Sequence, residues 1–428
     1  MKLYGQGRAA LADDAVTAER LDWGARRRSR GDPDLVLAPR DGDPRREPWI
    51  APPWYRPGLG LDLLRRRPAR RPHWTYLPGA PGVVRGLAKL AEPLATRGQS
   101  VGLAGLGRVG GVAATILAAA PTRLSGIREL LIHDIDAANQ QRWLLELGSI
   151  ARWRGRDGLP LVRAAGPGEM FARCDAFLFA ATDGVPPLGT RGEVRLVQFA
   201  PNRVILDGFL AEARRAAFAG LFLIVSDPVE WLAQAAFFDS NCDREGRFAG
   251  DGIAPERIAG LGLGVMWARA LAAARRQGWG DAVAGAGAAY GPHSTEVVAF
   301  DDVARPDRER SERLSRAARE CNVKVRDLGH LPYVGPGVSS VGLMLPPLLA
   351  GREVLASVFV DGIYFGAPAR LAWGLHPTAR RMADEVWSAL AALHAQLRAQ
   401  AQALDLLWGE GPPPGARGRS GPRDRDRD

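Results

Sequence analysis

Short runs of consecutive apolar residues alternate with longer segments through the middle of the chain. The runs lie at residues 101–104, 129–133, 175–182 and 221–226, and helices are expected between them, the clearest over 111–120 and 137–150. Continuous apolar runs are typical of parallel strands that helices cover on both faces. The alternation therefore predicts an α/β fold with a Rossmann-like, doubly wound parallel sheet.

The pattern changes beyond about residue 255. It predicts helices over 258–276, 307–320 and 378–407, a strand over 296–300, and an antiparallel hairpin of 354–360 with 362–368. This mixture predicts a second, α+β domain. The expected organisation is an Arg-, Pro- and Trp-rich extension at 1–97, a Rossmann domain at 98–240, the α+β domain at 241–408 and a disordered tail at 409–428.

A glycine-rich turn follows the first apolar run. Gly105, Gly107 and Gly110 form G-x-G-x-x-G, with Arg108 and Val109 between the last two glycines. The first glycine permits a sharp turn, the second lets the backbone approach a pyrophosphate, and the third lets the helix pack on the strand. The phosphates are then expected at the helix N-terminus, although a structural glycine turn in another α/β unit remains the alternative.

An acidic residue ends the next apolar run. Asp134 follows Glu129-Leu-Leu-Ile-His133, and its carboxylate is placed to accept both ribose hydroxyls of a dinucleotide. A carboxylate at this point repels a 2'-phosphate, so the pattern favours NAD. The segment 98–240 is therefore expected to be an NAD-binding domain.

The charge and aromatic composition bear on whether the protein binds nucleic acid. The formal net charge is +10, and almost all 57 basic residues are arginine, because Lys2, Lys89 and Lys324 are the only lysines. The tryptophans and arginines of 1–97 have the residue types that stack on nucleic-acid bases. No nucleic-acid-binding motif accompanies them, so nucleic acid is not the favoured partner.

Cysteine usage and hydropathy favour the cytoplasm. Cys174, Cys242 and Cys321 are far apart and never in C-x-x-C spacing, which argues against a disulfide framework and against a metal site. The N-terminus lacks an apolar leader, and no run of about 18 apolar residues predicts a membrane span. We expect a cytoplasmic protein that does not enter membranes.

Over residues 99–405, the chain resembles the lactate/malate dehydrogenase family, whose motifs occur in the family's order. They are Gly105–Gly110 with Asp134, Thr182–Pro186 followed by Arg195–Asn202, Val225–Val229, Gly260–Arg269, and Gly291–Glu296. The resemblance implies the family's fold, an NAD cofactor contacted also by Thr182 and Gly184, a 2-keto or 2-hydroxy acid substrate, and a homo-oligomer.

The same resemblance assigns roles to the charged residues. Reduction of a 2-keto acid needs a cation for its carboxylate, a second cation for its carbonyl, and an acid to protonate the new alkoxide. Arg269 corresponds to the carboxylate clamp, Arg195 to the polarising cation, with Arg191 as its alternative, and His293 to the proton donor. A structural loop histidine and a helix arginine paired to a neighbouring carboxylate are the alternatives for His293 and Arg269.

Two positions depart from the family pattern. Met266 stands where the family has the aspartate that orients the histidine, and Asp227 stands where it has an asparagine. A thioether cannot stabilise an imidazolium, so His293 is expected to be a poorer acid unless Asp227 or Glu296 supplies the charge. Pro187 occupies the expected specificity position, where malate enzymes carry arginine, which disfavours a dicarboxylic substrate.

Two functional hypotheses compete. The first is an NAD-dependent oxidoreductase of 2-hydroxy or 2-keto acids with altered catalytic residues. The second is a catalytically weakened, NAD-binding sensor or accessory protein, favoured by Met266 and by the non-family residues 1–97. NAD-dependent glycosidases are a third and weaker possibility, because no convincing set of metal ligands surrounds Cys242.

Overall fold

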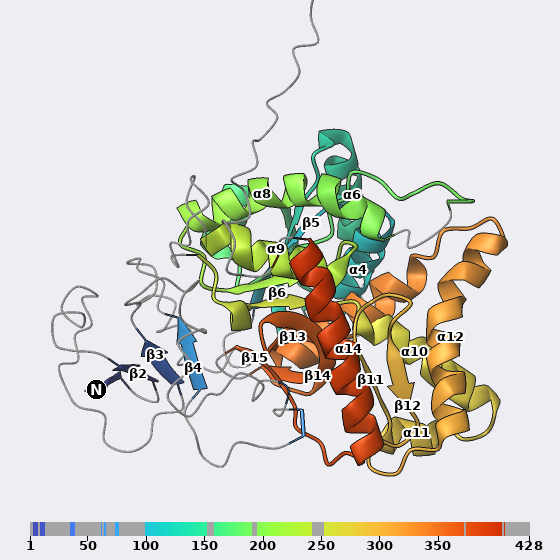
Figure 1. Cartoon of the computed structure of the whole chain (residues 1–428). Helices are drawn as coiled ribbons and strands as arrows, with labels where there is room; N and C mark the ends of the chain where they lie inside the picture. The colour runs from blue at the N-terminus through green and yellow to red at the C-terminus, as the bar shows by residue number, and fades with distance from the viewer. Residues whose placement is uncertain are drawn as a thin grey trace, which may run out of the picture.

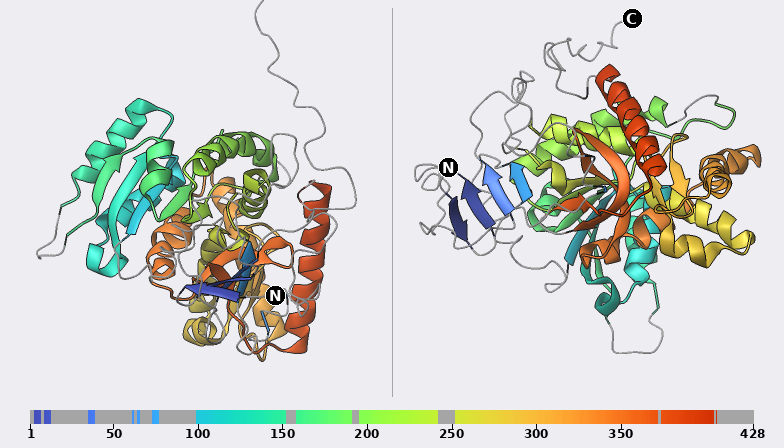
Figure 2. Two further views of the ribbon diagram at one scale, coloured as in Figure 1. Left: turned by 90° about the vertical axis from the view of Figure 1, so that its left-hand side faces the viewer. Right: turned by 60° about the horizontal axis from the view of Figure 1, so that its bottom comes forward.

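A large mixed sheet with helices on both faces forms the centre of the molecule (Figures 1 and 2). The computed structural model of the chain describes residues 3–6, 9–12, 35–38, 61, 64–65, 73–76, 99–151, 158–190, 195–241, 252–371, 374–404 and 406. Within these residues the sheet has nine strands, in the order β15-β14-β13-β10-β9-β8-β5-β6-β7.

Six neighbouring strands of this sheet run parallel. They are β5 (Gln99–Ala104), β6 (Ile127–His133), β7 (Leu161–Ala164), β8 (Ala176–Phe179), β9 (Leu221–Ile224) and β10 (Ile258–Gly260). The four apolar runs of the sequence are β5, β6, β8 and β9, so the doubly wound Rossmann-like sheet is confirmed. The strand order reverses beside β5, which lies between β6 and β8. Ligands of such sheets bind in the crevice beyond the strands at this point.

Two pairs of contacting helices pack with the parallel strands. They are α4 (Arg108–Ala119) with α6 (Ala137–Gly148), and α8 (Phe199–Arg215) with α9 (Val229–Asn241). Helix α6 begins close to its expected start because the Asp136 side chain accepts hydrogen bonds from the Ala138 and Asn139 amides at 2.9 and 3.3 Å. The core between strands and helices includes a cluster of aromatic rings, Phe171, Phe177, Phe209 and Phe222.

The second half of the chain extends the same sheet with antiparallel strands. These are β13 (Val354–Val360), β14 (Ile363–Leu371) and β15 (Leu375–Pro377). The expected hairpin is confirmed as β13 and β14. Helix α10 (Leu263–Arg276) packs on α12 (Arg308–Asp327), and β11 (Ala288–Tyr290) pairs with β12 (Val298–Phe300). The α+β character of this half is thereby confirmed.

The helix expected over 258–276 is wrong at its start. Residues 258–260 form β10, which bonds to β9 on one side and to β13 on the other, and α10 begins only at Leu263. The expected strand over 296–300 is shorter, and the helix expected over 307–320 continues to Asp327.

The helix expected over 378–407 begins six residues late, at Asp384 as α14 (Asp384–Ala403). The amides before it donate to distant carbonyls instead: Thr378 to Pro368, Arg380 to Leu64, and Ala383 to Val303. Hydrogen bonds to distant segments thus replace the first helical turn. The local sequence does not show these partners.

Part of the N-terminal extension forms a second, small sheet. Its strands are β1 (Leu3–Gln6), β2 (Ala9–Ala12), β3 (Leu35–Ala38) and β4 (His73–Tyr76), drawn in blue beside the large sheet (Figure 2). Residues 26–28, 49–55, 82–96 and 409–428, on which the other expectations for the extension and the tail rest, lie outside the described residues. The domain boundaries near 98, 241 and 408 remain predictions.

Candidate active site

The three glycines of the motif have three different surroundings. Gly105 has φ of +91°, and a Cβ there would lie 2.4 Å from the Ala181 amide nitrogen, which follows β8. A Cβ on Gly110 would lie 1.9 Å from the Gly105 carbonyl oxygen, so a side chain there is excluded. A Cβ on Gly107 would meet no atom within 4 Å. The turn is therefore closely packed at Gly105 and Gly110 but open at Gly107, where a phosphate would meet the N-terminus of α4.

Asp134 ties the end of β6 to this turn. Its Oδ2 accepts hydrogen bonds from the Leu106 amide at 2.8 Å and from Asn139 Nδ2 at 3.0 Å, and its Oδ1 accepts from the Asp136 amide at 3.0 Å. A carboxylate has about four acceptor positions, so one remains for a ribose hydroxyl, fewer than the two needed to accept both hydroxyls as expected. The geometry of the turn and of Asp134 fits a dinucleotide.

The other residues expected at the cofactor lie at the start of α4 and in the loop after β8. Arg108 is exposed at the start of α4, with its guanidinium 5.8 Å from the Tyr333 ring centroid. Val109 is half-buried in the first turn of α4. Thr182 Oγ1 donates to the Gly184 carbonyl at 3.1 Å and accepts from the Gly184 amide at 3.3 Å, which shapes the loop after β8.

Three expected catalytic residues meet at the end of β9. The Asp227 carboxylate lies between two basic groups, with Oδ2 3.7 Å from Arg195 Nε and Oδ1 3.8 Å from His293 Nε2. Asp227 is in the short loop between β9 and α9, whereas His293 is in the loop between β11 and β12. Arg195 and His293 are both buried. The structure thus brings together residues separated by 98 positions, from 195 to 293.

Arg269 completes the cluster from α10. Its Nη1 donates to Met266 Sδ at 3.3 Å, one turn earlier on the helix. Burial lowers the pKa of Arg269, the charge of Arg195 lowers it further, and Cys321 and Asp227 oppose the change. Helix α10 contains no Asp or Glu, so a carboxylate paired with Arg269 would have to come from another element, and Asp227 is one whose charge acts on it.

His293 is held neutral by its surroundings. Burial lowers the pKa of His293 well below its ordinary value of 6.5, and the charges of Arg195 and Arg269 lower it further, whereas a main-chain hydrogen bond with Gly262 opposes the change. Among the described residues, Nδ1 has no hydrogen-bond partner, which agrees with Met266 in place of an acid. The ring lies against Gly262, where a Cβ would be 2.6 Å from His293 Cβ.

Glu296, one of the two candidates for the missing charge, is engaged elsewhere. Its Oε1 accepts from Gln396 and Gln400 of α14, both at 2.6 Å, and its Oε2 accepts from Ser294 Oγ at 3.2 Å. Asp227 is therefore the better candidate of the two.

Sequence reasoning missed residues that hold the site through main-chain atoms. The Asn202 side chain accepts from the Asp183 amide at 2.9 Å and donates to the Asp227 carbonyl at 2.8 Å, which joins the loops after β8 and β9. Arg326 Nη2, at the end of α12, donates to the carbonyls of Pro186 and Pro187 at 3.1 and 2.6 Å. Asn202 ends the motif segment Arg195–Asn202, whereas Arg326 lies outside every motif segment.

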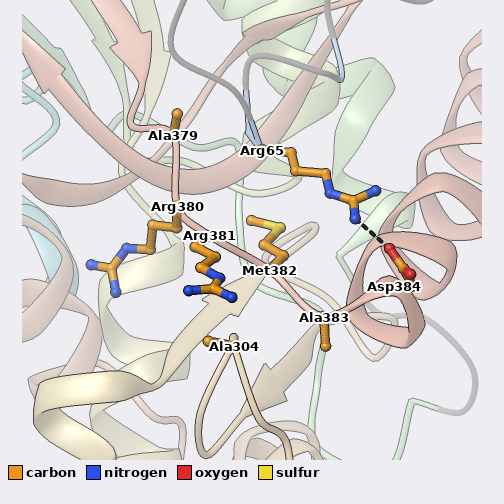
Figure 3. Close-up of a pocket in the computed structure, with 8 residues that line it drawn as sticks. All are labelled: Arg65, Ala304, Ala379, Arg380, Arg381, Met382, Ala383 and Asp384. Atoms are coloured by element: carbon orange, nitrogen blue, oxygen red, sulfur yellow. Dashed lines mark hydrogen bonds and ion pairs between the residues drawn. The ribbon is translucent and has the colours of Figure 1, made fainter.

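A basic pocket of about 610 Å³ lies elsewhere, at the start of α14 (Figure 3). Its lining includes Arg65, Arg380, Arg381 and Asp384. Arg65 pairs with Asp384, and Arg380 pairs with Glu353 outside the lining, so two of its three cations are already neutralised. None of the residues that line it belongs to the cluster around Asp227.

Metal and membrane signals are both absent from the part of the chain that the structure describes. No group of three or more His, Cys, Asp or Glu side chains is arranged to hold a metal ion there. No described helix is long and apolar enough to cross a membrane.

Comparisons with solved structures identify the fold. The minor L-lactate dehydrogenase of Enterococcus mundtii is 17% identical, with a TM-score of 0.57, and the match covers 72% of this chain and 98% of that one. Lactate dehydrogenase of Cryptosporidium parvum, complexed with lactic acid and nicotinamide adenine dinucleotide, is 15% identical, with a TM-score of 0.57 over 73% and 99% of the chains. Malate dehydrogenase of Plasmodium falciparum, in complex with NADH, is 14% identical, with a TM-score of 0.54 over 72% and 99%.

No family model and no curated protein matches the sequence. At these identities the structural likeness speaks for the fold alone. The chain therefore has the fold of the lactate and malate dehydrogenases.

Proposed function

We propose that the protein is an NAD-dependent oxidoreductase that interconverts a 2-hydroxy acid and a 2-oxo acid. The observation that carries this proposal is the cluster of Arg195, Asp227, Arg269 and His293 beside the ends of the parallel strands. Two cations, one carboxylate and one imidazole are the groups that binding a carboxylate, polarising a carbonyl and moving one proton require.

The glycine turn and Asp134 support NAD as the cofactor. The open space at Gly107 and the α4 N-terminus would receive the pyrophosphate, with Arg108 and Val109 beside it, and Asp134 would receive the ribose. Thr182 and Gly184, after β8, would border the nicotinamide half. The cofactor would supply the hydride acceptor or donor, and the chain's residues would bind the substrate and move the proton.

Arg269 and Arg195 would bind the substrate. Arg269 would hold the carboxylate with two parallel N–H groups, which its planar guanidinium suits. Arg195 would lie at the reacting oxygen, where its positive charge stabilises the developing alkoxide. Desolvation makes both interactions stronger than they would be in water.

His293 would move the proton at the same oxygen. Its lowered pKa makes the free site a base at neutral pH, which suits removal of the hydroxyl proton from a 2-hydroxy acid. The carboxylate of a bound substrate would oppose the two arginine charges and raise the pKa of His293 again. Asp227, at 3.8 Å from Nε2, would orient the ring and compensate for Met266.

The first experiment is NADH binding by the purified protein, followed by NADH oxidation against a panel of 2-oxo acids and NAD reduction with the matching 2-hydroxy acids. The expected result is binding with turnover on at least one monocarboxylic member, because Pro187 supplies no cation for a second carboxylate. Asp227→Asn should lower turnover by about tenfold or more, since it removes the charge beside His293. Unchanged turnover in that variant would contradict the compensating role of Asp227.

Binding without turnover across the panel would favour the second function, an NAD-binding sensor or accessory protein. The observations that favour it are Met266 and the Nδ1 of His293, which has no hydrogen-bond partner in the part of the chain that the structure describes. Cys242, the only suggestion of a metal-dependent glycosidase, lies outside the described residues. Homo-oligomer formation and a cytoplasmic location stay predictions, for which size measurements in solution and cell fractionation are the tests.

A further inference from the structure

A buried carboxyl lies directly behind the candidate catalytic histidine. Glu230, in the first turn of α9, is 4% exposed. Its Oε1 accepts a hydrogen bond from the His293 amide at 3.0 Å and another from Ser357 Oγ, on β13, at 2.6 Å. Glu230 therefore joins α9, the β11–β12 loop and β13 at one point behind the site.

This carboxyl has no basic partner among the described residues. The groups that face it are Ser357 from β13, His293 from the β11–β12 loop, and Asp227 from the loop before its own helix. Burial raises the pKa of Glu230 to about 7, and the Asp227 charge adds to the rise. Burying an unpaired carboxyl is costly, so a role for it at the site merits a test.

The same region lacks the usual support for the histidine ring. Nδ1 has no hydrogen-bond partner among the described residues, and the Met266 thioether accepts from Arg269 Nη1 at 3.3 Å. The ring is limited by the close surface of Gly262 on one side and by Asp227 at Nε2. A main-chain hydrogen bond with Gly262 also supports the histidine. The main chain of His293 is held in turn by the Glu230 carboxyl, which accepts from its amide.

We propose that Glu230 is a positioning residue of this site, which holds the His293 main chain, with the help of Ser357, so that Nε2 faces Asp227. The consequence for catalysis rests on the proposed oxidoreductase function, whereas the positioning itself does not. An ionised acceptor forms shorter and stronger hydrogen bonds than a neutral one. Deprotonation of Glu230 as the pH rises through about 7 therefore tightens the hold on His293.

The test compares Glu230→Gln, Glu230→Ala and Ser357→Ala in the full-length protein. Glutamine keeps the acceptor oxygen without the charge, whereas alanine removes both. Gln234→Ala is the matched control, because Gln234 is also buried and hydrogen-bonded on α9, but to Gly362, Tyr364 and Leu406 instead of His293. The first readout is the ring resonance of His293 by histidine-labelled NMR, recorded from pH 5 to 9 without any substrate.

Glu230→Ala should shift or broaden the His293 resonance, Glu230→Gln should keep it near its wild-type position but without the change near pH 7, and Gln234→Ala should leave it unaltered. In turnover, Glu230→Ala should lower kcat by about 10- to 100-fold with a small change in KM, the cost of a misplaced catalytic group. Glu230→Gln should recover most of kcat.

An unchanged His293 resonance in Glu230→Ala, or an equal change in Gln234→Ala, would overturn the proposal. If the resonance responds as expected but no variant and no wild-type protein turns over an acid, the positioning role stands and the oxidoreductase function fails. The two failures are therefore distinguishable.

Discussion

At the scale of single residues, substitutions at two glycines test cofactor binding and catalysis separately. Gly107 has ordinary backbone angles and no atom within 4 Å of a Cβ position, so alanine fits there without strain. Its methyl group would occupy the space proposed for the pyrophosphate. Gly107→Ala should weaken NADH binding by about tenfold, or 1.4 kcal/mol, without lowering Tm. Fluorescence titration and thermal unfolding measure the two quantities.

Gly262→Ala tests the other half of the site. Its Cβ would lie 2.6 Å from His293 Cβ and 3.1 Å from Val229 Cγ2, so the imidazole must shift. We expect kcat to fall by about 10- to 100-fold while NADH binding stays at the wild-type value. Loss of NADH binding in this variant, or equal effects of both glycine variants on both quantities, would contradict the assignment of the two halves.

The raised pKa of Glu230 should also make the free energy of unfolding depend on pH. Its pKa is about 7 in the folded protein, against 4.5 ordinarily, so the folded state binds the proton more tightly than the unfolded state. The stabilisation is fully present below pH 4.5 and is lost as the pH rises through 7, about 3 kcal/mol in all. Glu230→Gln, which never ionises, should abolish this decline. Denaturant unfolding at pH 5 and pH 8 measures the difference.

The charged residues of the site were accessible from the sequence because each lies in an ordered series of short motifs. Asn202 and Glu230 were not recognised for their roles, because each binds main-chain amides or carbonyls of loops that are distant in sequence. Almost every residue has a main-chain amide and carbonyl, whatever its side chain. A contact to these groups therefore does not appear as a motif in the sequence.

At the scale of elements, the apolar runs predicted the parallel strands well, because a strand buried on both faces needs apolar side chains throughout. The start of α14 was wrong by six residues, since the amides of Thr378, Arg380 and Ala383 bond to other elements. Propensity describes a segment alone, and these amides are satisfied by carbonyls that only the folded chain provides.

The loop 182–190 is held in place by a side chain of α12. Arg326 of α12 donates to the carbonyls of Pro186 and Pro187 and so fastens the loop to the second half of the molecule. Arg326→Ala should raise KM for the acid by about fivefold, because ordering the loop then costs binding energy. NADH binding should stay unchanged, and hydrogen exchange at residues 183–190 should become faster.

Lys324→Ala is the control for Arg326→Ala. Lys324 lies on the same turn of α12 but pairs with Glu320 at 2.8 Å in an exposed position. It should change neither KM nor the exchange of the loop. An Arg326→Ala protein with wild-type exchange at 183–190 would show that the loop is held by other contacts.

At the scale of the whole molecule, residues 61, 64 and 65 of the N-terminal extension are described and contact the core. Leu64 is fully buried in the main hydrophobic cluster, its carbonyl accepts from the Arg380 amide at 2.8 Å, and Arg65 pairs with Asp384 beside the pocket of Figure 3. The solved dehydrogenases with this fold match about 72% of the chain.

We expect Leu64→Ala to lower the free energy of unfolding by about 2–4 kcal/mol, because it leaves a cavity in the core. Arg65→Ala should cost at most about 1 kcal/mol, because Asp384 is largely exposed and solvent screens the pair. Limited trypsin digestion should then cut residues 1–97 faster in Leu64→Ala than in Arg65→Ala, at a temperature where both remain folded. Equal stability and equal cleavage in the two variants would mean that Leu64 does not anchor the extension, and that the second half of the molecule folds without it.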